Sequence, residues 1–429
     1  MEAQVVYGVN ITIAIIFFIC YSYQMIYLLI GFIDKKRTHT LYEPKKLHKF
    51  AVLISARNEH AVIGELLESI RRQDYPKELL HVFLVADNCT DNTAEIGRRF
   101  GATVYERFNK KEVGKGYALN FAFRHIFSDP ANDYEAFIIL DADNLLEFNY
   151  VTEMNRVFDQ GYRASTSYRN SKNYAQNWIT SGYGLWFMRE AEYLNRPRSV
   201  LHSSCAISGT GFFVAADLLK ERGGWNYHTL TEDIEFSAVT ATLGDTIGYA
   251  GRDVLYDEQP ITFAQSWRQR IRWAKGFYQV LGHYGGDLLK GIFSLKKHWF
   301  SCFDMLMNIM PALFIMLFGI IFNACALIYV AFIVEDPSST HLWNACLGSI
   351  VMSMVYFYMV FFVVGVLTTL TEWNNILANT GMKIRTIFTF PLFMLTYIPI
   401  AIAALFKKVE WTPIEHTVVR SIDDMKNKE

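Results

Sequence analysis

Residues 136–144 read AFIILDADN, and this stretch decides the fold class of the chain. Its apolar run suits a short buried β-strand, and Asp141 and Asp143 follow that run at once. Two residues apart in an extended segment, the two carboxylates face the same side. Paired carboxylates suit a hard divalent ion that also takes phosphate oxygens, so the stretch predicts a Mg²⁺ or Mn²⁺ site. An isolated Asp-x-Asp is also common in ordinary loops, and its place after a strand is what favours the metal.

Short apolar runs and amphipathic segments alternate upstream of this stretch. The expected strands are 49–55, 81–86, 103–105 and 136–140, and the expected helices are 59–72, 91–100 and 115–126. Such a β-α-β alternation predicts a mostly parallel sheet covered by helices. Parallel sheets bind ligands at the carboxyl ends of their strands, so polar residues placed there become candidates for a site.

Polar residues do follow the expected strands. Glu59 comes shortly after the first strand, Asp87 after the second and Asp141 after the fourth. Gly114-Lys115-Gly116 precedes a helix, where glycines let a phosphate approach backbone N–H groups. A glycine turn with a solvated lysine would give the same pattern.

Two further segments carry chemistry downstream. Ser208-Gly209-Thr210 offers flexible backbone, and Thr231-Glu232-Asp233 precedes a helix. Thr231 or Asp233 would cap that helix in the simplest interpretation. Alternatively, an acid in a cleft acts as a general base.

Residues 265–277 read QSWRQRIRWAKGF. On a helix, Gln269 and Trp273 share one face, and Arg272 lies on the adjacent face. A sugar ring stacks on indole while amides hold its hydroxyls, and arginine pairs with a pyrophosphate. A basic helix beside the membrane that binds acidic lipid head groups would explain the charges, but not the Gln/Trp face.

The composition indicates that part of the chain avoids water. Of 429 residues, 52% are hydrophobic and only 19% are charged, against roughly 25% in average soluble proteins. The net charge of −1 argues against nucleic acid as the main partner. The six cysteines form no C-x-x-C pair and indicate buried thiols in a reducing setting.

Uncharged runs long enough to span a bilayer lie at both ends. Residues 11–33 are followed by Lys35-Lys36-Arg37, which places the N-terminus outside and the next segment in the cytoplasm. Residues 305–334 and 342–371 are two more expected spans, joined by the acidic loop 335–341. Residues 386–406 contain Pro391 and Pro399, so they form either a third C-terminal span or a broken interfacial helix.

These patterns predict a multi-pass cell-membrane protein with five parts. The expected parts are an N-terminal anchor (1–40), a cytoplasmic domain (41–287), an interfacial helix (288–304), transmembrane and interfacial helices (305–406) and a cytoplasmic tail (407–429).

Four motifs in order resemble those of the inverting family 2 glycosyltransferases. They are Asp87, Asp141-Ala142-Asp143, Thr231-Glu232-Asp233 and Gln269-x-x-Arg272-Trp273. The chain is similar, from about Lys46 onward, to the membrane-embedded branch that makes polysaccharides, which includes cellulose, chitin, chito-oligosaccharide, hyaluronan and poly-N-acetylglucosamine synthases. The resemblance implies an α/β GT-A-type, Rossmann-like nucleotide-sugar-binding domain inserted between transmembrane helices.

The resemblance also implies roles for individual residues on the donor side. Glu59 and Asp87 would hold the uracil and ribose, and Lys115 would lie near the nucleotide. Asp141 would contact the nucleotide and share with Asp143 the binding of Mg²⁺ or Mn²⁺.

On the acceptor side, Asp233, beside Glu232, would take the proton from the acceptor hydroxyl. Gln269, Arg272 and Trp273 would position the acceptor and the diphosphate, and the loop of Ser208, Gly209 and Thr210 would line the acceptor cleft.

The implied activity is processive synthesis of a β-linked polysaccharide from UDP-N-acetylglucosamine or UDP-glucose, with the product passing into or across the bilayer. The expected partners are the UDP-sugar, the growing polysaccharide and the lipid bilayer, with no nucleic acid; an accessory export subunit stays open. Transfer of a single sugar to a lipid or other membrane acceptor is the alternative. A transporter or non-catalytic scaffold is disfavoured, because the expected spans lack charged residues in their interiors.

Overall fold

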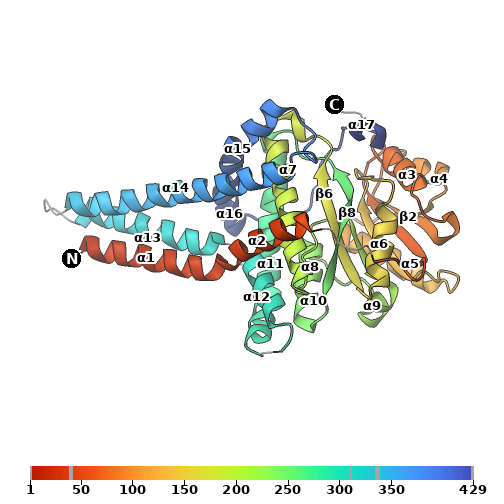
Figure 1. Cartoon of the computed structure of the whole chain (residues 1–429), viewed down its shortest axis with the longest axis horizontal. Coiled ribbons are helices and arrows are strands. Elements are labelled where there is room, and N and C mark those ends of the chain that lie inside the picture. Colours follow the sequence, from red (N-terminus) through yellow and green to blue (C-terminus); the bar gives the residue numbers. More distant parts are fainter. Residues whose placement is uncertain (1, 38–41, 295, 310–311, 334–338, 427–429) are drawn as a thin grey trace.

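The computed structural model describes residues 2–37, 42–294, 296–309, 312–333 and 339–426. It consists of an α/β domain from which three long helices project on one side (Figure 1). These helices are α1 (Glu2–Tyr21), α13 (Ala312–Ile333) and α14 (Ser339–Thr371). The N-terminus lies at the far end of this projection, and the C-terminus returns to the α/β domain.

One mixed eight-stranded sheet forms the centre of the domain, in the order β3-β2-β1-β4-β7-β6-β8-β5. The strands are β1 (Phe50–Ala56), β2 (Leu80–Asp87), β3 (Thr103–Arg107), β4 (Ala136–Asp141), β5 (Leu145–Leu146), β6 (Ala164–Ser171), β7 (Phe212–Ala215) and β8 (Ile247–Asp257). The four expected strands are confirmed as a parallel set, β3-β2-β1-β4. The second half departs from the expectation, because β7 runs antiparallel to both β4 and β6.

Alternation along the strands builds one core on each face of the sheet. Leu53 and Ile139 pack into one hydrophobic cluster, and Val52 and Ile138 pack into the other. Each fully buried side chain of this kind contributes about 1.5–3 kcal/mol from the hydrophobic effect. The expected helices cover these faces as α3 (Ile63–Arg71), α4 (Thr93–Arg99) and α5 (Lys115–Ser128), and α6 (Tyr150–Asp159) is a further helix that was not predicted.

The second half of the domain contributes helices of very different lengths. They are α7 (Trp178–Glu190), the π-helix η3 (Ala191–Asn195), α8 (Arg196–Val200), α9 (Ala216–Glu221), α10 (Glu232–Leu243), α11 (Phe263–Phe293) and α12 (Trp299–Ile309). Short 3₁₀ turns, η1 (Lys77–Leu79) and η2 (Tyr174–Gln176), complete the domain. A capping box between Thr262 and Gln265 starts α11. The single interfacial helix expected at 288–304 is therefore the end of α11 and the start of α12, and 305–309 belong to α12 rather than to a span.

Among the described residues, three helical stretches are by length and composition able to cross a membrane: Ala3–Lys36, Thr340–Thr371 and Thr380–Phe406. The first comprises α1 and α2 (Tyr23–Lys36), and the last comprises α15 (Thr380–Leu395) and α16 (Tyr397–Phe406). Because α15 packs on both α14 and α7, and α16 packs on α11, this last stretch lies against the projecting helix α14 as well as the α/β domain. The two alternatives, a span and a broken interfacial helix, therefore both stay predictions. In the expected acidic loop 335–341, residues 335–338 lie outside the described residues.

A buried ion pair ties the first of these stretches to the domain. The Asp304 carboxylate on α12 accepts two hydrogen bonds from the Arg198 guanidinium, at 2.6 and 3.0 Å. It also accepts one from the hydroxyl of Tyr23 and one from that of Tyr27, each at 2.8 Å. One carboxylate thus joins α2, α8 and α12.

Candidate active site

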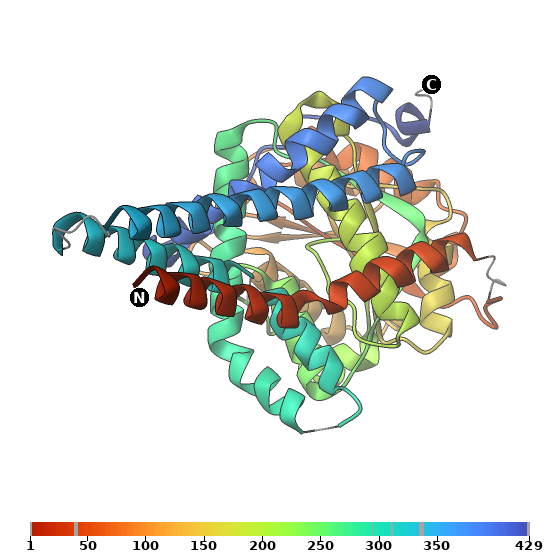
Figure 2. The ribbon, with the colours of Figure 1, turned by 60° about the vertical axis from the view of Figure 1, so that its left-hand side comes forward.

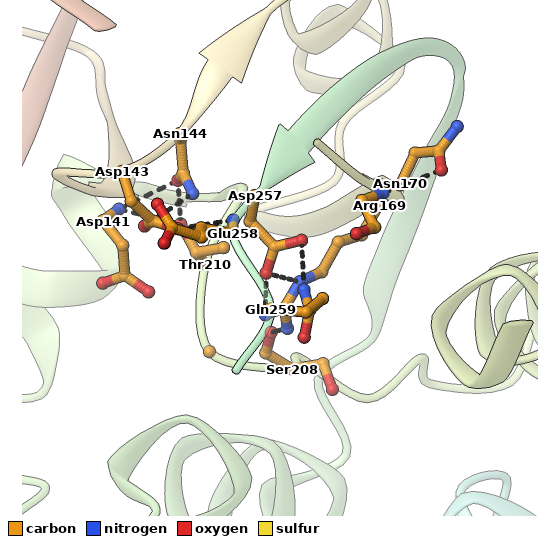
Figure 3. A network of polar contacts seen from close by, with 12 residues as sticks. Asp141, Asp143, Asn144, Arg169, Asn170, Ser208, Thr210, Asp257, Glu258 and Gln259 are labelled. Atoms are coloured by element: carbon orange, nitrogen blue, oxygen red, sulfur yellow. Dashed lines mark hydrogen bonds and ion pairs between the residues drawn. The ribbon is translucent and has the colours of Figure 1, made fainter. Parts of the chain in front are cut away.

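The DADN turn after β4 and the loop after residue 207 hold each other in place (Figure 3). The Asp141 N–H donates to the Asn144 side-chain oxygen at 3.0 Å and to the Thr210 hydroxyl at 2.9 Å. The Thr210 hydroxyl in turn donates to Asn144 at 2.5 Å. Gly209 and Gly211 flank Thr210 with φ of +79° and +69°, a conformation that favours glycine. The expected Ser208–Thr210 loop is therefore part of the site at the end of β4.

Lys115 begins α5 and bridges these two segments. Its ammonium donates to an Asp141 carboxylate oxygen at 2.5 Å and to the Gly209 carbonyl at 2.8 Å. Gly116 has a packing role, since a Cβ there would lie 2.1 Å from the Tyr227 carbonyl oxygen. The lysine predicted near the nucleotide thus stands beside the first aspartate of the Asp-x-Asp pair.

Glu232 and Asp233 are the first two residues of α10 (Glu232–Leu243). The N-cap Thr231 makes no side-chain capping bond, and Asp233 instead accepts the Gly209 N–H at 2.5 Å. Burial raises the pKa of Asp233, and burial together with the Asp233 charge raises the pKa of Glu232 to about 8. A carboxylate with a raised pKa is a better proton acceptor near neutral pH, as a general base requires.

The Gln269-x-x-Arg272-Trp273 motif lies on α11 and faces this acidic pair. Among the charges that act on the Arg272 guanidinium are those of Glu232, Asp141 and Asp233, yet burial still lowers its pKa. Trp273 stands edge-on to Tyr183, with 5.8 Å between ring centroids. The Gln269 side-chain oxygen is buried and has no hydrogen-bond partner among the described residues. The structure therefore brings Arg272 to the predicted base and leaves the buried Gln269 oxygen without a protein partner among the described residues.

Arg270, inside the same motif, has a different role that the sequence did not indicate. Its side chain is fully buried and donates to the Phe393 carbonyl at 3.2 Å and to the Thr396 hydroxyl at 2.7 Å. It thereby closes the C-terminal end of α15, where a cation is favourable. The pattern of apolar and basic residues in the sequence cannot distinguish the role of this buried arginine from that of Arg272, two residues away.

Asp143 is the more enclosed carboxylate of the Asp-x-Asp pair. One of its oxygens accepts the Glu258 N–H at 2.7 Å. Asp257 lies near Asp143 in Figure 3 and accepts a hydrogen bond from the Arg169 Nε at 2.7 Å. Burial, together with the Asp143 charge, raises the pKa of Asp257 to about 6. Several carboxylates thus share a small volume.

This arrangement bears on the expected metal. Among the residues that the structure describes, no group of three or more His, Cys, Asp or Glu side chains is arranged to hold an ion. The donor chemistry nevertheless fits, because Asp141 and Asp143 offer hard oxygen ligands within an acidic cluster. The two aspartates therefore remain the candidates for Mg²⁺ or Mn²⁺.

The two residues predicted to hold the nucleoside have protein partners here. Both carboxylate oxygens of Glu59 lie 3.0 Å from the His416 Nδ1. Burial raises the pKa of Glu59. Asp87 accepts the Arg107 guanidinium at 2.7 Å and the Asn88 amide at 3.1 Å. Glu59 thus stands beside the acidic cluster, whereas Asp87 is neutralised by Arg107.

The C-terminal segment contributes residues that the sequence did not indicate. Residues after 407 return to the site, and the Thr417 and Val418 N–H groups donate to the Glu258 carboxylate at 3.0 and 2.9 Å. The Trp411 ring lies 5.4 Å from the Arg57 guanidinium and 5.9 Å from that of Arg272. Burial opposes protonation of His416, but Asp143 and Glu59 raise its pKa to about 10. The segment expected as a separate tail thus packs against the site beside Glu59 and Glu258, and α17 (Ile422–Lys426) follows it.

Comparisons with known proteins bear on the family and the fold of the chain. A family model described as "Glycosyltransferase like family 2" matches residues 48–276. The probable glycosyltransferase YdaM of Bacillus subtilis is 27% identical over 269 residues, which cover 59% of this chain and 60% of that protein. The β-monoglucosyldiacylglycerol synthase of Nostoc sp. is 27% identical over 60% of this chain and 54% of its own length. The poly-β-1,6-N-acetyl-D-glucosamine synthase of Staphylococcus epidermidis is 26% identical over 60% of this chain and 64% of its length.

The chain therefore spans between half and two thirds of the length of these relatives. Among solved structures, a mannosyltransferase from Pyrobaculum calidifontis in complex with GDP-Man and Mn²⁺ aligns with 94% of this chain and 99% of its own, at a TM-score of 0.57 and 18% identity. At that identity the likeness concerns the fold alone.

Proposed function

The chain belongs to glycosyltransferase-like family 2, and from this premise we propose that it is an inverting hexosyltransferase that uses a UDP-sugar. One observation carries the proposal. Asp233, fixed by the Gly209 N–H, shares a small site with Lys115, Asp141 and Arg272. A base thus stands beside cationic groups that suit a diphosphate leaving group.

The proposed reaction uses these groups as follows. Asp233 takes the proton of the acceptor hydroxyl while the oxygen of that hydroxyl attacks the anomeric carbon. The bond from that carbon to the diphosphate oxygen breaks, UDP leaves, and an α-linked donor gives a β-linked product. Lys115 and Arg272 stabilise the charge that develops on the diphosphate. A Mg²⁺ or Mn²⁺ ion held by Asp141 and Asp143 would neutralise more of that charge.

The donor sugar is proposed from the relatives. Their names specify glucosyl transfer and poly-N-acetylglucosamine synthesis, which supports UDP-glucose or UDP-N-acetylglucosamine. Glu59 and Asp87 are proposed to meet the uracil and ribose, which requires that His416 and Arg107 give up part of their contacts.

We propose that the enzyme lies in the cell membrane with its catalytic domain in the cytoplasm, and that its acceptor is one of two candidates. A growing β-linked polysaccharide, made processively, is supported by the Gln269 and Trp273 side chains, which lie on α11 together with Arg272. A lipid that receives one sugar is supported by the relatives whose names specify β-monoglucosyldiacylglycerol synthesis.

Purified protein in nanodiscs, given Mg²⁺ or Mn²⁺ and each common UDP-sugar in turn, tests the proposal. We expect UDP release with one or two sugars, and its loss in Asp233→Asn with UDP binding retained. If no UDP-sugar supports UDP release, the proposed function is wrong.

A further inference from the structure

The loop that contacts the proposed base has little means of fixing its own conformation. Residues 208–211 read Ser-Gly-Thr-Gly, and both glycines have positive φ. The contact with the base is made by backbone, since the Gly209 N–H donates to an Asp233 carboxylate oxygen at 2.5 Å. The direction of that N–H depends on the orientation of the 208–209 peptide group, which glycine leaves free to rotate. A group outside the loop is therefore needed to hold this peptide.

Arg169 on β6 binds the other side of the same peptide group (Figure 3). One of its terminal guanidinium nitrogens, Nη1, donates to the Ser208 carbonyl at 2.8 Å. In a planar trans peptide the carbonyl and the N–H point in opposite directions, so Arg169 and Asp233 bind opposite sides of one group. A cation at the carbonyl polarises the peptide and strengthens the hydrogen bond that its N–H donates. Arg169 thus acts on the contact with Asp233 through one peptide group.

The Arg169 side chain is itself held in one place. Its Nε donates to Asp257 at 2.7 Å, and its guanidinium lies 3.7 Å from the centroid of the Phe187 ring. Burial disfavours its charge, but the carboxylates of Asp257, Asp141 and Asp143 raise its pKa, so the guanidinium stays protonated. An arginine fixed by an acid and an aromatic ring can hold a peptide that glycine leaves free.

The strand that carries Arg169 is anchored from its other face. Tyr168 and Asn170 alternate with Arg169 along the strand and so lie on that opposite face. The Tyr168 hydroxyl donates to the Glu372 carboxylate at 2.6 Å, and the Asn170 amide donates to the Asn375 carbonyl at 2.8 Å. Glu372 directly follows α14, and α14 and α2 both extend over the α/β domain (Figure 2). The position of Arg169 is therefore set by contacts that do not involve the 208–211 loop.

We propose that Arg169 is a positioning residue for the proposed base. It fixes the 208–209 peptide group, so that the Gly209 N–H holds the Asp233 carboxylate in the orientation in which it accepts the proton of the acceptor hydroxyl. The inference rests on the proposed function, because Asp233 is the base of that same reaction. Arg169 touches neither the donor nor the acceptor in this role, and it acts through the peptide alone.

The test compares Arg169→Met with the matched variant Arg163→Met, each in the full chain in nanodiscs. Arg163 directly precedes β6, roughly 20 Å along the strand from Arg169, and it pairs with Glu221 outside the site. The donor is UDP-glucose or UDP-N-acetylglucosamine, whichever supports UDP release. We expect Arg169→Met to lower kcat about 10–100-fold and to leave the Kd for UDP unchanged, because only the base is misplaced. Arg163→Met should change neither value.

The acid limb of kcat against pH gives a second readout. Without Arg169 the hydrogen bond from the Gly209 N–H to the charged form of Asp233 weakens, so the limb should move to higher pH by about half a unit or more. A general loss of packing would lower kcat without moving the limb. The other charged groups around this carboxylate stay the same in both variants; they are Glu232 on its own helix, Lys115 on α5, Asp141 at the end of β4 and Arg272 on α11.

Hydrogen exchange of the loop, followed by mass spectrometry, needs no turnover. The amides of residues 208–211 should exchange faster in Arg169→Met and at the wild-type rate in Arg163→Met. Arg169→Lys keeps a charge beside Asp257 but lacks the planar fork, so it should give an intermediate kcat and an intermediate exchange rate. If melting curves show that Arg169→Met does not fold, because Asp257 has lost its buried partner, Arg169→Lys carries the test in its place.

Two results would overturn the inference and leave the proposed function intact. One is an Arg169 variant with the kcat, acid limb and exchange rate of Arg163→Met. The other is a lowered kcat with an unmoved acid limb and an unchanged exchange rate. Absence of UDP release from the wild-type chain with every UDP-sugar overturns the proposed function, and the role of Arg169 in that reaction with it.

Discussion

Replacing Asp304 by asparagine should strongly destabilise the protein, although this residue lies outside the proposed site. The Asp304 side chain is 1% exposed, and it is the carboxylate that neutralises the Arg198 guanidinium. Breaking a buried pair by removing one partner costs about 3–5 kcal/mol, because the remaining charge stays buried. At roughly 2–4 °C per kcal/mol for domains of 150–250 residues, this corresponds to a decrease in Tm of about 6–20 °C.

Thermal unfolding in detergent, followed by tryptophan fluorescence, measures this effect. The double variant Arg198→Met with Asp304→Leu is the control, because it removes both charges and should recover most of the lost stability. If Asp304→Asn shifts the Tm by less than 2 °C, or if the double variant is no more stable than the single one, the packing of α2, α8 and α12 around this ion pair is wrong.

Three further predictions concern the site. The value of kcat/KM should rise with pH along a limb above the usual carboxyl range, because burial raises the pKa of both Glu232 and Asp233 and the base must be deprotonated; a limb near pH 4 would contradict this assignment. Chelation by EDTA should abolish UDP release and Mn²⁺ should restore it, whereas Asp143→Asn should require a higher Mn²⁺ concentration; activity that is insensitive to EDTA would remove the metal from the account. Trp411→Ala should raise the KM for the UDP-sugar several-fold and Trp411→Phe should have a smaller effect, since the ring stands between two arginines; equal KM values in all three proteins would show that the C-terminal segment does not act on the donor.

The parallel half of the sheet could be predicted because its signals are local. Each strand is a short apolar run, and each helix carries its own apolar face, as in α3, where Ile63, Leu66, Leu67 and Ile70 are all buried. The register then places Ser55 beside Asp141, so polar residues after β1 and β4 meet at one edge. The antiparallel β7 could not be predicted in the same way, since strand direction depends on contacts distant in sequence.

The site residues also fall into two groups, those marked by local motifs and those positioned by contacts distant in sequence. Asp141, Asp143, Asp233 and Arg272 were found through spaced motifs, and the structure brings them together. His416 was missed because its partner Glu59 lies 357 residues away, and no periodicity marks the C-terminal segment. The contacts of Lys115 and Arg270 depend on which neighbouring element faces each side chain, and that information is absent from a local pattern.

The central claim is that Asp233 accepts the proton in an inverting transfer from a UDP-sugar. Proton NMR of the reaction, followed from the first turnover, measures the anomeric configuration of the product together with the rate. The account predicts a β-linked product from the α-linked donor and a rate lowered by about 10²–10⁴-fold in Asp233→Asn. An α-linked product, or an Asp233→Asn variant that turns over at the wild-type rate, would contradict it.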